Sequence, residues 1–259
     1  MTLVRVETAG PVAEVVLARP EARNALSAEM CRGLVSALAQ VGASDARAVL
    51  IRGEGKTFCS GADFAAVSGP GGLDFLPAFE EMLERVAAFR LPTVACIQGG
   101  AFGGGFQLAT VCDFRIAAAN AKLGIPAARI GIVVNFENVQ RLVRVAGVAR
   151  AKEILMAGRT FTGAEAEAAG IVTRAVPADE LEAAARDFAG DLAALSPLSV
   201  QGAKAAIGLV ERALSDARST HRAETESIDA LVERAYRSDD LQEGLAAMAE
   251  RRPPRFRSR

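Results

Sequence analysis

The glycine-rich stretch at residues 99–105 constrains the fold more than any other part of the chain, because it holds five glycines in seven residues. It follows an apolar run at 93–98, which predicts a strand, and precedes an apolar segment that predicts a helix starting near Phe106. Free N–H groups at a helix start, with the positive end of the helix dipole behind them, suit an oxyanion or a polarised carbonyl. Such glycines also serve close helix-on-strand packing or a sharp turn, so this stretch alone leaves both interpretations open.

A second stretch, residues 57–64 (T-F-C-S-G-A-D-F), shifts the balance toward a binding role. It follows another predicted buried strand at 48–52 and places Gly61 and Ala62 where backbone N–H groups could project from a turn. Two such turns can supply one donor each, and two convergent donors form an oxyanion hole. Removing one donor from a working hole costs on the order of 100- to 1000-fold in rate. The pattern predicts a site for one enolate or thioester oxygen.

Four segments together resemble the crotonase (enoyl-CoA hydratase/isomerase) family, in both order and spacing. They are residues 19–26 (R-P-E-A-R-N-A-L), 58–63 (F-C-S-G-A-D), 103–105 (G-G-G) and 252–256 (R-P-P-R-F). The likeness covers essentially the whole chain and implies oxyanion-hole N–H groups at Ala62 and Gly104. It also implies a coenzyme A (CoA) site, with Phe256 near the adenine and 3′-phosphate. The CoA-binding residues implied are Arg23, Asn24, Ala25, Leu26, Ser60, Ala62, Asp63, Phe64 and Phe256.

The alternation of strands and helices predicts an α/β fold, and the resemblance narrows it to a crotonase-type ββα spiral core with a C-terminal α-helical oligomerisation region. Residues 1–195 are expected to form the core, and residues 196–259 a helical region that covers the pocket and builds a homotrimer or a dimer of trimers. Strands are predicted at 3–7, 12–18, 48–52, 93–98, 113–118, 121–123 and 170–176. Helices are predicted after Ser27, at 76–89, after Thr162, and at 178–194, 198–214, 218–236 and 239–250.

The composition limits which binding partners and which cellular compartment are expected for this protein. A formal net charge of −1 over 259 residues does not indicate nucleic acid or an anionic membrane as a partner. The four cysteines form no C-x-x-C pair, which predicts reduced thiols in a cytoplasmic protein. No signal-like N-terminus and no run of about 18 apolar residues occur, so a soluble protein is expected. Neither a metal site nor a cofactor is predicted, with a CoA thioester as substrate or ligand.

The catalytic pattern of the family is interrupted in this chain. Crotonase hydratases hold a water between two glutamates, and positioned acid–base groups typically contribute about 100- to 10,000-fold each. The resemblance places the first glutamate at Gln107 and the second at Ala127, directly after Pro126. Some isomerase members carry an aspartate where this chain has Asn135. All three positions hold residues that cannot exchange a proton near neutral pH.

One carboxylate, Glu137, lies close to these positions in the sequence, at the predicted start of a helix. Its structural interpretation is a favourable negative charge in a first helical turn. Its functional interpretation is a relocated base for proton transfer at the α or γ carbon of the acyl group. Asp63 likewise has a catalytic interpretation and a favoured structural one, as an N-cap or loop clamp at the start of its helix.

Three further features have mainly structural interpretations. His221, the only histidine, is predicted on a surface helix, and Tyr236, the only tyrosine, is predicted to pack rather than enter the pocket. Residues 66–75 (A-V-S-G-P-G-G-L-D-F) form the least regular segment, and their position suggests a lid over the acyl pocket.

Two functional hypotheses follow. The first is a hydratase/isomerase-type enzyme that keeps the oxyanion hole and moves protons through Glu137, a water bound to Gln107, or another residue. The second is a non-catalytic acyl-CoA-binding or carrier protein, in which Gln107 and Asn135 hydrogen-bond the ligand. The sequence predicts a fatty acyl-CoA (enoyl-CoA) binding member of the family with weak, altered or absent two-glutamate hydration, and fatty-acid metabolism is implied only by the resemblance.

Overall fold

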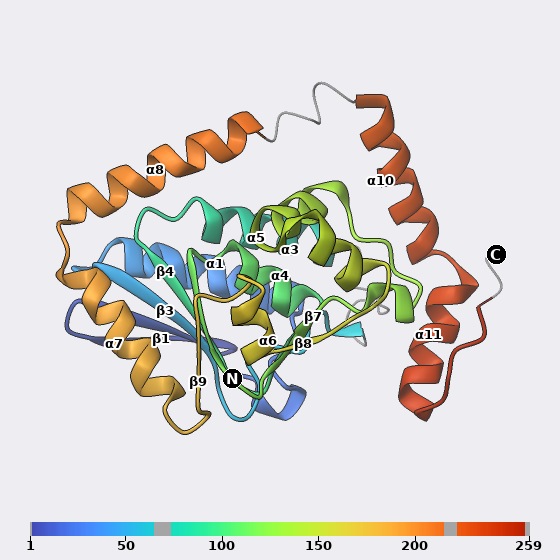
Figure 1. The fold of residues 1–259 in the computed structure, drawn as a ribbon, viewed down its shortest axis with the longest axis horizontal. Coiled ribbons are helices and arrows are strands. Elements are labelled where there is room, and N and C mark those ends of the chain that lie inside the picture. The colour runs from blue at the N-terminus through green and yellow to red at the C-terminus, as the bar shows by residue number, and fades with distance from the viewer. Residues whose placement is uncertain (1, 65–73, 215–221, 257–259) are drawn as a thin grey trace. The chain divides into compact units, whose positions relative to one another are not determined.

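The computed structural model of the protein describes residues 2–64, 74–214 and 222–256 (Figure 1). The chain divides into two compact units, each built from two separate segments. The first unit combines Met1–Leu123 with Phe161–Leu209, and the second combines Gly124–Thr160 with Val210–Arg259. The division expected from the sequence, into a core at residues 1–195 and a helical region at 196–259, stays a prediction.

A six-stranded sheet forms the centre of the first unit, in the order β1-β2-β3-β4-β6-β9. β1 pairs with β2 in antiparallel register, and the remaining neighbours are parallel. β2, β3, β4 and β6 are almost wholly buried, as expected for strands covered on both faces, whereas Arg174 in the edge strand β9 is exposed. The bounds are β1 (Val4–Ala9), β2 (Val12–Leu17), β3 (Ala48–Gly53), β4 (Thr93–Ile97), β6 (Phe114–Ala118) and β9 (Arg174–Val176).

A smaller sheet of three short strands, in the order β5-β7-β8, belongs almost entirely to the first unit as well. β5 (Gly100–Phe102) lies inside the glycine-rich stretch, where the sequence predicted only a turn. It is followed in the sheet by β7 (Lys122–Gly124) and β8 (Phe161–Thr162). The glycine-rich stretch is therefore held by sheet hydrogen bonds as well as by the helix that follows it.

Helices cover both faces of the large sheet (Figure 1). α1 (Ala28–Gly42) contacts β1, β2 and α3 (Phe75–Ala87), whereas α7 (Leu181–Ala194) contacts β2, β3, β4 and β6. The predicted caps are confirmed: the Ser27 hydroxyl accepts from the Met30 N–H, and a capping box at Thr162 opens α6 (Gly163–Ala168). The remaining helices of this unit are α4 (Gly104–Val111) and most of α8 (Pro197–Leu214).

The second unit is mostly helical. It contains α5 (Phe136–Leu155), α10 (Arg222–Tyr236), α11 (Asp239–Glu250) and the short turn η3 (Ala127–Arg129). α5 bends at Gly147, whose φ of 71° is not helical. α11 packs against the segment after η3 so closely that a Cβ on Gly244 would lie 2.5 Å from the Ile130 Cα. Glycine at position 244 permits this contact.

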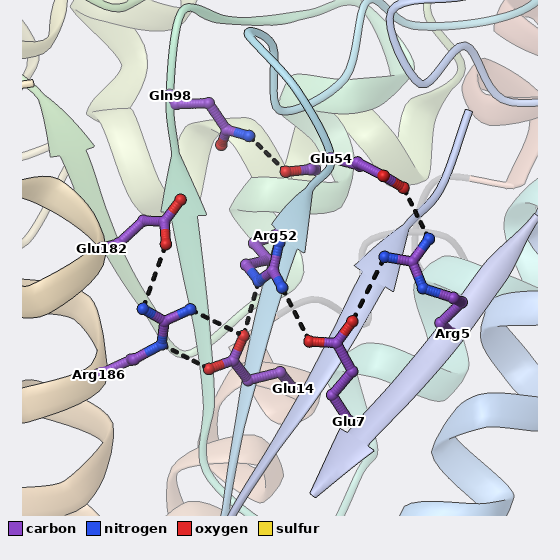
Figure 2. A network of polar contacts seen from close by, with 9 residues as sticks. Arg5, Glu7, Glu14, Arg52, Glu54, Gln98, Glu182 and Arg186 are labelled. Atoms are coloured by element: carbon purple, nitrogen blue, oxygen red, sulfur yellow. Dashed lines mark hydrogen bonds and ion pairs between the residues drawn. The ribbon is translucent and has the colours of Figure 1, made fainter. Parts of the chain in front are cut away.

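A chain of ion pairs crosses the face of the large sheet that α7 covers (Figure 2). Glu7 and Glu14 lie directly opposite one another on β1 and β2, an arrangement that is unfavourable for two like charges. Arg52 of β3 resolves this conflict by donating to Glu14 at 2.6 Å and to Glu7 at 2.9 Å. Arg186 of α7 donates to the other oxygen of Glu14 at 2.6 Å and so ties the helix to the sheet.

All four cysteines, Cys31, Cys59, Cys96 and Cys112, are buried and none forms a disulfide in this structure. Burial raises the pKa of each thiol to about 12.

Over the described ranges no single helix is both long and apolar enough to cross a membrane. The helix pair Leu181–Ala194 and Pro197–Arg212, bent by 102°, is long and apolar enough only when its two helices are taken together. The same ranges contain no group of three or more His, Cys, Asp or Glu side chains placed to hold a metal ion.

Candidate functional site

The two glycine turns lie side by side in the first unit. The Cys59 N–H donates to the Gly100 carbonyl at 3.2 Å, and the Phe102 N–H donates back to the Cys59 carbonyl at 3.0 Å. Gly61 has a φ of +98°, and a Cβ there would lie 2.7 Å from the Phe102 carbonyl oxygen. The same Cβ would lie 3.4 Å from the Gly104 nitrogen. Only glycine allows this approach, so the turns predicted from separate parts of the chain are brought into contact.

The two N–H groups singled out by the sequence are available in this arrangement. Gly104 is the first residue of α4, and its neighbour Gly103 is the N-cap with a φ of 51°. The Phe106 and Gln107 N–H groups turn back to the Gly103 carbonyl, at 3.1 and 3.0 Å. Within the described residues no hydrogen bond engages the backbone N–H of Ala62 or of Gly104. The helix start therefore offers donors to a ligand, as helix N-termini do.

The loop at residues 19–26 is fastened to the first turn by main-chain bonds. The Ser60 N–H donates to the Arg23 carbonyl at 3.0 Å. The Leu26 N–H donates to the Gly61 carbonyl at 2.7 Å, and the Asp63 N–H donates to the Leu26 carbonyl at 2.8 Å. These last two bonds flank Ala62, so the loop holds the peptide group that carries the Ala62 N–H.

Asn24 holds the loop in shape from inside. It is fully buried, and its side-chain oxygen accepts from the Arg19 N–H at 3.0 Å. Its amide nitrogen donates to the carbonyls of Glu54 and Thr57, at 3.0 and 2.8 Å. Arg23 and Asn24 both have positive φ, near 52° and 55°, which a tight, fully bonded loop can maintain. The hydrogen bonds of the Asn24 side chain therefore stabilise the conformation of the loop.

Two side-chain contacts add to this fastening. The Cys59 thiol, which burial keeps protonated with its pKa raised to about 12, donates to the Asn24 carbonyl at 3.1 Å. Arg19 forms an ion pair with Asp63 at 2.5 Å, and the Asp63 side chain is only 14% exposed. The ion pair connects the start of the loop to the residue after Ala62, which is the position that the clamp interpretation of Asp63 requires.

The other predicted CoA-binding residues differ in their surroundings. Ala25 and Leu26 are buried, whereas Ser60 and Phe64 are half-buried. Phe256 is 40% exposed and belongs to the second unit. Most of the predicted lid at 66–75 and the whole of His221 lie outside the described residues.

Gln107 closes the first turn of α4, three residues after Gly104 and hence on the same helix face. The residue is 8% exposed, and its side-chain oxygen is buried with no hydrogen-bond partner among the described residues. A buried amide oxygen without a donor is uncommon and costs about 1–3 kcal/mol. The Gln107 side chain is therefore a polar group left open beside the helix start.

The remaining predicted positions lie in the second unit. Ala127 is buried in η3. Asn135 is the N-cap of α5, and its side-chain oxygen accepts from the Asn138 N–H at 3.0 Å. Glu137 follows in the first turn of α5, where a negative charge is favourable. Asn135 thus has a structural task, and both interpretations of Glu137 remain open.

The sequence analysis missed Arg115, which lies in β6 and is 9% exposed. Its guanidinium donates to the carbonyls of Ala109, Cys112 and Ile171. Two of these carbonyls belong to the C-terminal end of α4, the helix whose N-terminus carries the Gly104 N–H. An arginine inside a predicted buried strand was the signal that could have identified it.

Comparison with known proteins decides the family. The family model described as enoyl-CoA hydratase/isomerase matches residues 7–259. The chain belongs to the enoyl-CoA hydratase/isomerase family. It is 36% identical over 259 residues to a Mycobacterium bovis protein named "Probable enoyl-CoA hydratase echA8", a match that covers 99% of this chain and 98% of the relative.

Solved structures of related proteins share the fold. A methylmalonyl-CoA decarboxylase in complex with 2-nitronate-propionyl-CoA is 25% identical, with a TM-score of 0.87 and 99% of each chain covered. An enoyl-CoA hydratase/isomerase from Pseudoalteromonas atlantica T6c is 28% identical, with a TM-score of 0.85, 98% of this chain covered and 100% of the other. The predicted fold class, a crotonase-type α/β core followed by C-terminal helices, is therefore confirmed.

Proposed function

We propose that this enoyl-CoA hydratase/isomerase family protein binds a fatty acyl-CoA or enoyl-CoA thioester, with the thioester oxygen between the N–H groups of Ala62 and Gly104. The observation that carries the proposal is the contact between the two turns, which a side chain on Gly61 would prevent. Both N–H groups lack partners among the described residues, which supports a ligand oxygen as their acceptor. A relative that holds 2-nitronate-propionyl-CoA in its solved structure supports a CoA thioester as the ligand class.

The CoA portion is proposed to lie along the loop at residues 19–26. Asn24 and Cys59 bond this loop to neighbouring turns, and these bonds need no ligand. A preformed loop binds a ligand without the cost of becoming ordered. Phe256 and the arginines beside it are proposed to serve the adenine and the 3′-phosphate, since arginine suits phosphate.

Ordinary two-glutamate hydration is proposed to be weak or absent. The amide of Gln107 and the methyl group of Ala127 cannot act as general acid or base at neutral pH. Proton transfer at the acyl group would then pass through Glu137, which follows Ala127 by ten residues and Asn135 by two. A favourable negative charge at the start of α5 is the competing account of Glu137, and the variant experiment below separates the two.

The alternative is a non-catalytic acyl-CoA-binding or carrier protein on the same scaffold. A specific observation favours keeping it: the buried oxygen of Gln107 has no partner among the described residues and could accept a hydrogen bond from a ligand or a bound water. Binding of that kind would require the two turns but no proton transfer.

Assembly into a homotrimer or a dimer of trimers is proposed for the same chain. Leu198 and Leu209 lie eleven residues apart on α8, and hence on one helix face, and each is more than 60% exposed, which leaves apolar surface for another copy to cover. Light scattering of the purified protein tests this proposal, and a monomer at micromolar concentration would contradict it.

A pair of variants at Gly104 tests the binding site. Proline at the first position of a helix is tolerated, so Gly104→Pro removes the N–H while keeping α4. Gly104→Ala keeps the N–H, and both variants add carbon atoms about as close as 3.1 Å to the Phe79 ring. Calorimetry with an acyl-CoA and with free CoA should show that proline abolishes the preference for acyl-CoA and alanine only weakens it. Equal acyl-CoA affinity in the wild type and the proline variant would contradict the role of this turn.

A second experiment separates the enzyme from the binding protein. Short- and long-chain enoyl-CoA are incubated with the protein in heavy water and followed by mass spectrometry, beside Glu137→Gln and the control Glu153→Gln on the same helix. Hydration, or deuterium at the α or γ carbon that only Glu137→Gln abolishes, would establish a relocated base. Activity that survives Glu137→Gln would place the base elsewhere, and tight binding with no exchange would favour the carrier.

A further inference from the structure

Arg115 is a buried charge that neither the proposed binding nor the proposed chemistry uses directly. It lies on β6 among residues that are themselves buried. Burial lowers the pKa of its guanidinium, with Cys112 and Asp113 acting in the opposite direction, and an arginine remains charged under these conditions. Burying a charge is unfavourable unless its hydrogen bonds are well satisfied, so its partners indicate its purpose.

All three side-chain hydrogen bonds of Arg115 go to main-chain carbonyls. One guanidinium nitrogen donates to Ala109 at 3.2 Å and to Cys112 at 2.7 Å. Another donates to Ile171 at 2.8 Å. The last carbonyls of a helix have no partner within the helix, and a cation there is also favoured by the helix dipole. Arg115 therefore caps the C-terminal end of α4 and joins it to residue 171.

The main chain of Arg115 fixes the same junction. Its N–H donates to the Thr173 hydroxyl at 3.1 Å, and its carbonyl accepts from the Thr173 N–H at 2.9 Å. The guanidinium is therefore held by a backbone that is itself bonded to the 171–173 segment. The end of α4 is attached to a fixed support.

The other end of α4 is fitted closely to the first glycine turn. A Cβ on Gly105 would lie 2.5 Å from the Cys59 carbonyl oxygen and 2.7 Å from its sulfur. A helix of eight residues is about 12 Å long and moves as one body. Its position is therefore set at two points, the Cys59 turn at the N-terminus and Arg115 at the C-terminus.

We propose that Arg115 is a positioning residue, which holds α4 by its C-terminal carbonyls and so keeps the Gly104 N–H beside the Gly61–Ala62 turn. The inference rests on the proposed function, because it assigns Arg115 to the placement of one of the two proposed donors. Misplacing a group of this kind by about 1 Å can cost on the order of 100-fold. Loss of the guanidinium leaves three carbonyls without their donor and frees the helix to shift.

The experiment compares Arg115→Met and Arg115→Lys with the control Arg52→Lys. Arg52 is also a low-exposure arginine in a strand, but its side-chain partners among the described residues are Glu7 and Glu14, on the face covered by α7. Calorimetry with butyryl-CoA and free CoA gives the preference for the thioester, and infrared spectroscopy of a ¹³C-labelled thioester carbonyl reports its polarisation. Free CoA is insensitive to the proposed donors because it has no carbonyl at the sulfur.

Arg115→Met is expected to reduce the thioester preference about tenfold or more and to shift the carbonyl stretch toward its frequency in water. Affinity for free CoA should change less than about twofold. Arg115→Lys keeps the positive charge but loses the planar guanidinium, so its thioester preference should lie between those of Arg115→Met and the wild type. Arg52→Lys should match the wild type. If Arg115→Met does not fold, Arg115→Lys alone tests the proposal, through the ratio of its affinities for butyryl-CoA and free CoA and through the carbonyl frequency.

Three results would overturn the inference. In the first, the wild type prefers butyryl-CoA over free CoA, and folded Arg115→Lys and Arg115→Met keep both that preference and the carbonyl frequency. This result would contradict the role of Arg115 and leave the proposed oxyanion site standing. Equal losses for free CoA and butyryl-CoA would show a general structural role in its place. A wild-type protein that binds the thioester no better than free CoA would overturn the proposed oxyanion site, and with it the inference.

Discussion

Gly61 lies against Gly104, so that a methyl group on Gly61 would be 3.4 Å from the Gly104 nitrogen and 2.7 Å from the Phe102 carbonyl oxygen. The two turns are separated by about forty residues of sequence but are packed main chain to main chain. This contact makes Gly61 a direct test of the candidate site.

Gly61→Ala is expected to abolish the preference for acyl-CoA over free CoA, since the added methyl group forces the turns apart. Gly170→Ala is the matched control, because Gly170 also has a positive φ, +72°, but no atom lies within 4 Å of its Cβ position. The control should lose only about 1–2 kcal/mol of stability from the backbone conformation. Calorimetry and thermal unfolding of both variants provide the measurement, and equal behaviour of the two would contradict a role for the contact.

Asp63→Asn is expected to weaken the binding of free CoA and of acyl-CoA together, by roughly three- to tenfold. The ion pair with Arg19, at 2.5 Å and largely shielded, holds the start of the 19–26 loop against the residue after Ala62. Arg19 also faces Glu21 at 3.9 Å, but that carboxylate is 73% exposed, and exposed pairs contribute little. Glu21→Gln is therefore the control and should bind as the wild type does in titration calorimetry. A loss confined to acyl-CoA would argue against a clamp on the loop.

Glu14→Gln is expected to lower the melting temperature at pH 7 by roughly 3–6 °C, because Arg52 and Arg186 lose their shared carboxylate. Burial alone would raise the pKa of Glu14, but the hydrogen bonds from Arg186 and Arg52 outweigh it and hold the pKa below its ordinary value of 4.5. A carboxylate with a lowered pKa stabilises the folded state above its unfolded pKa, and this contribution is lost as the pH falls through the folded value.

The difference between the wild type and Glu14→Gln should therefore shrink as the pH is lowered from about 5 toward 3. Calorimetric melting scans across this range measure it. Glu182→Gln is the control, since Glu182 pairs with Arg186 at 3.2 Å with 64% of its side chain exposed, and its melting temperature should stay within about 1 °C of the wild type. A gap at pH 7 that persists unchanged at pH 3 would exclude the carboxylate charge as its cause.

Lys204→Met is expected to loosen the first part of α8. The Lys204 ammonium donates to the Asp113 carboxylate at 2.6 Å and to the Leu91 carbonyl at 2.9 Å, and Asp113 also accepts from the N–H and hydroxyl of Thr93. Removal of the ammonium leaves α8 without this attachment to the sheet. Hydrogen exchange of α8 should become about tenfold faster, whereas Arg212→Met, at an exposed position of the same helix, should not change it.

Local patterns in the sequence predicted most elements because the interactions that define them span only a few residues. Ser27 and Thr162 mark helix starts through bonds to the third residue along the chain, and both caps are found. α11 was predicted with its observed bounds for the same reason. The apolar pattern placed the start of α4 near Phe106, two residues after the observed start at Gly104, because the glycines carry no apolar signal. The helix begins earlier since the Gly103 carbonyl accepts from the N–H groups of Phe106 and Gln107.

By itself, the sequence determined where turns, caps and apolar strands occur, and which residue types stand at the family's positions, including Gln107, Ala127 and Asn135. Only the tertiary structure decided that Gly61 touches the start of α4 and that Arg115 caps its end. It also decided that Glu14 meets Arg186, 172 residues away. Contacts of this kind depend on the path of the whole chain and on which side chains that path buries together, and no local pattern of residues encodes that path.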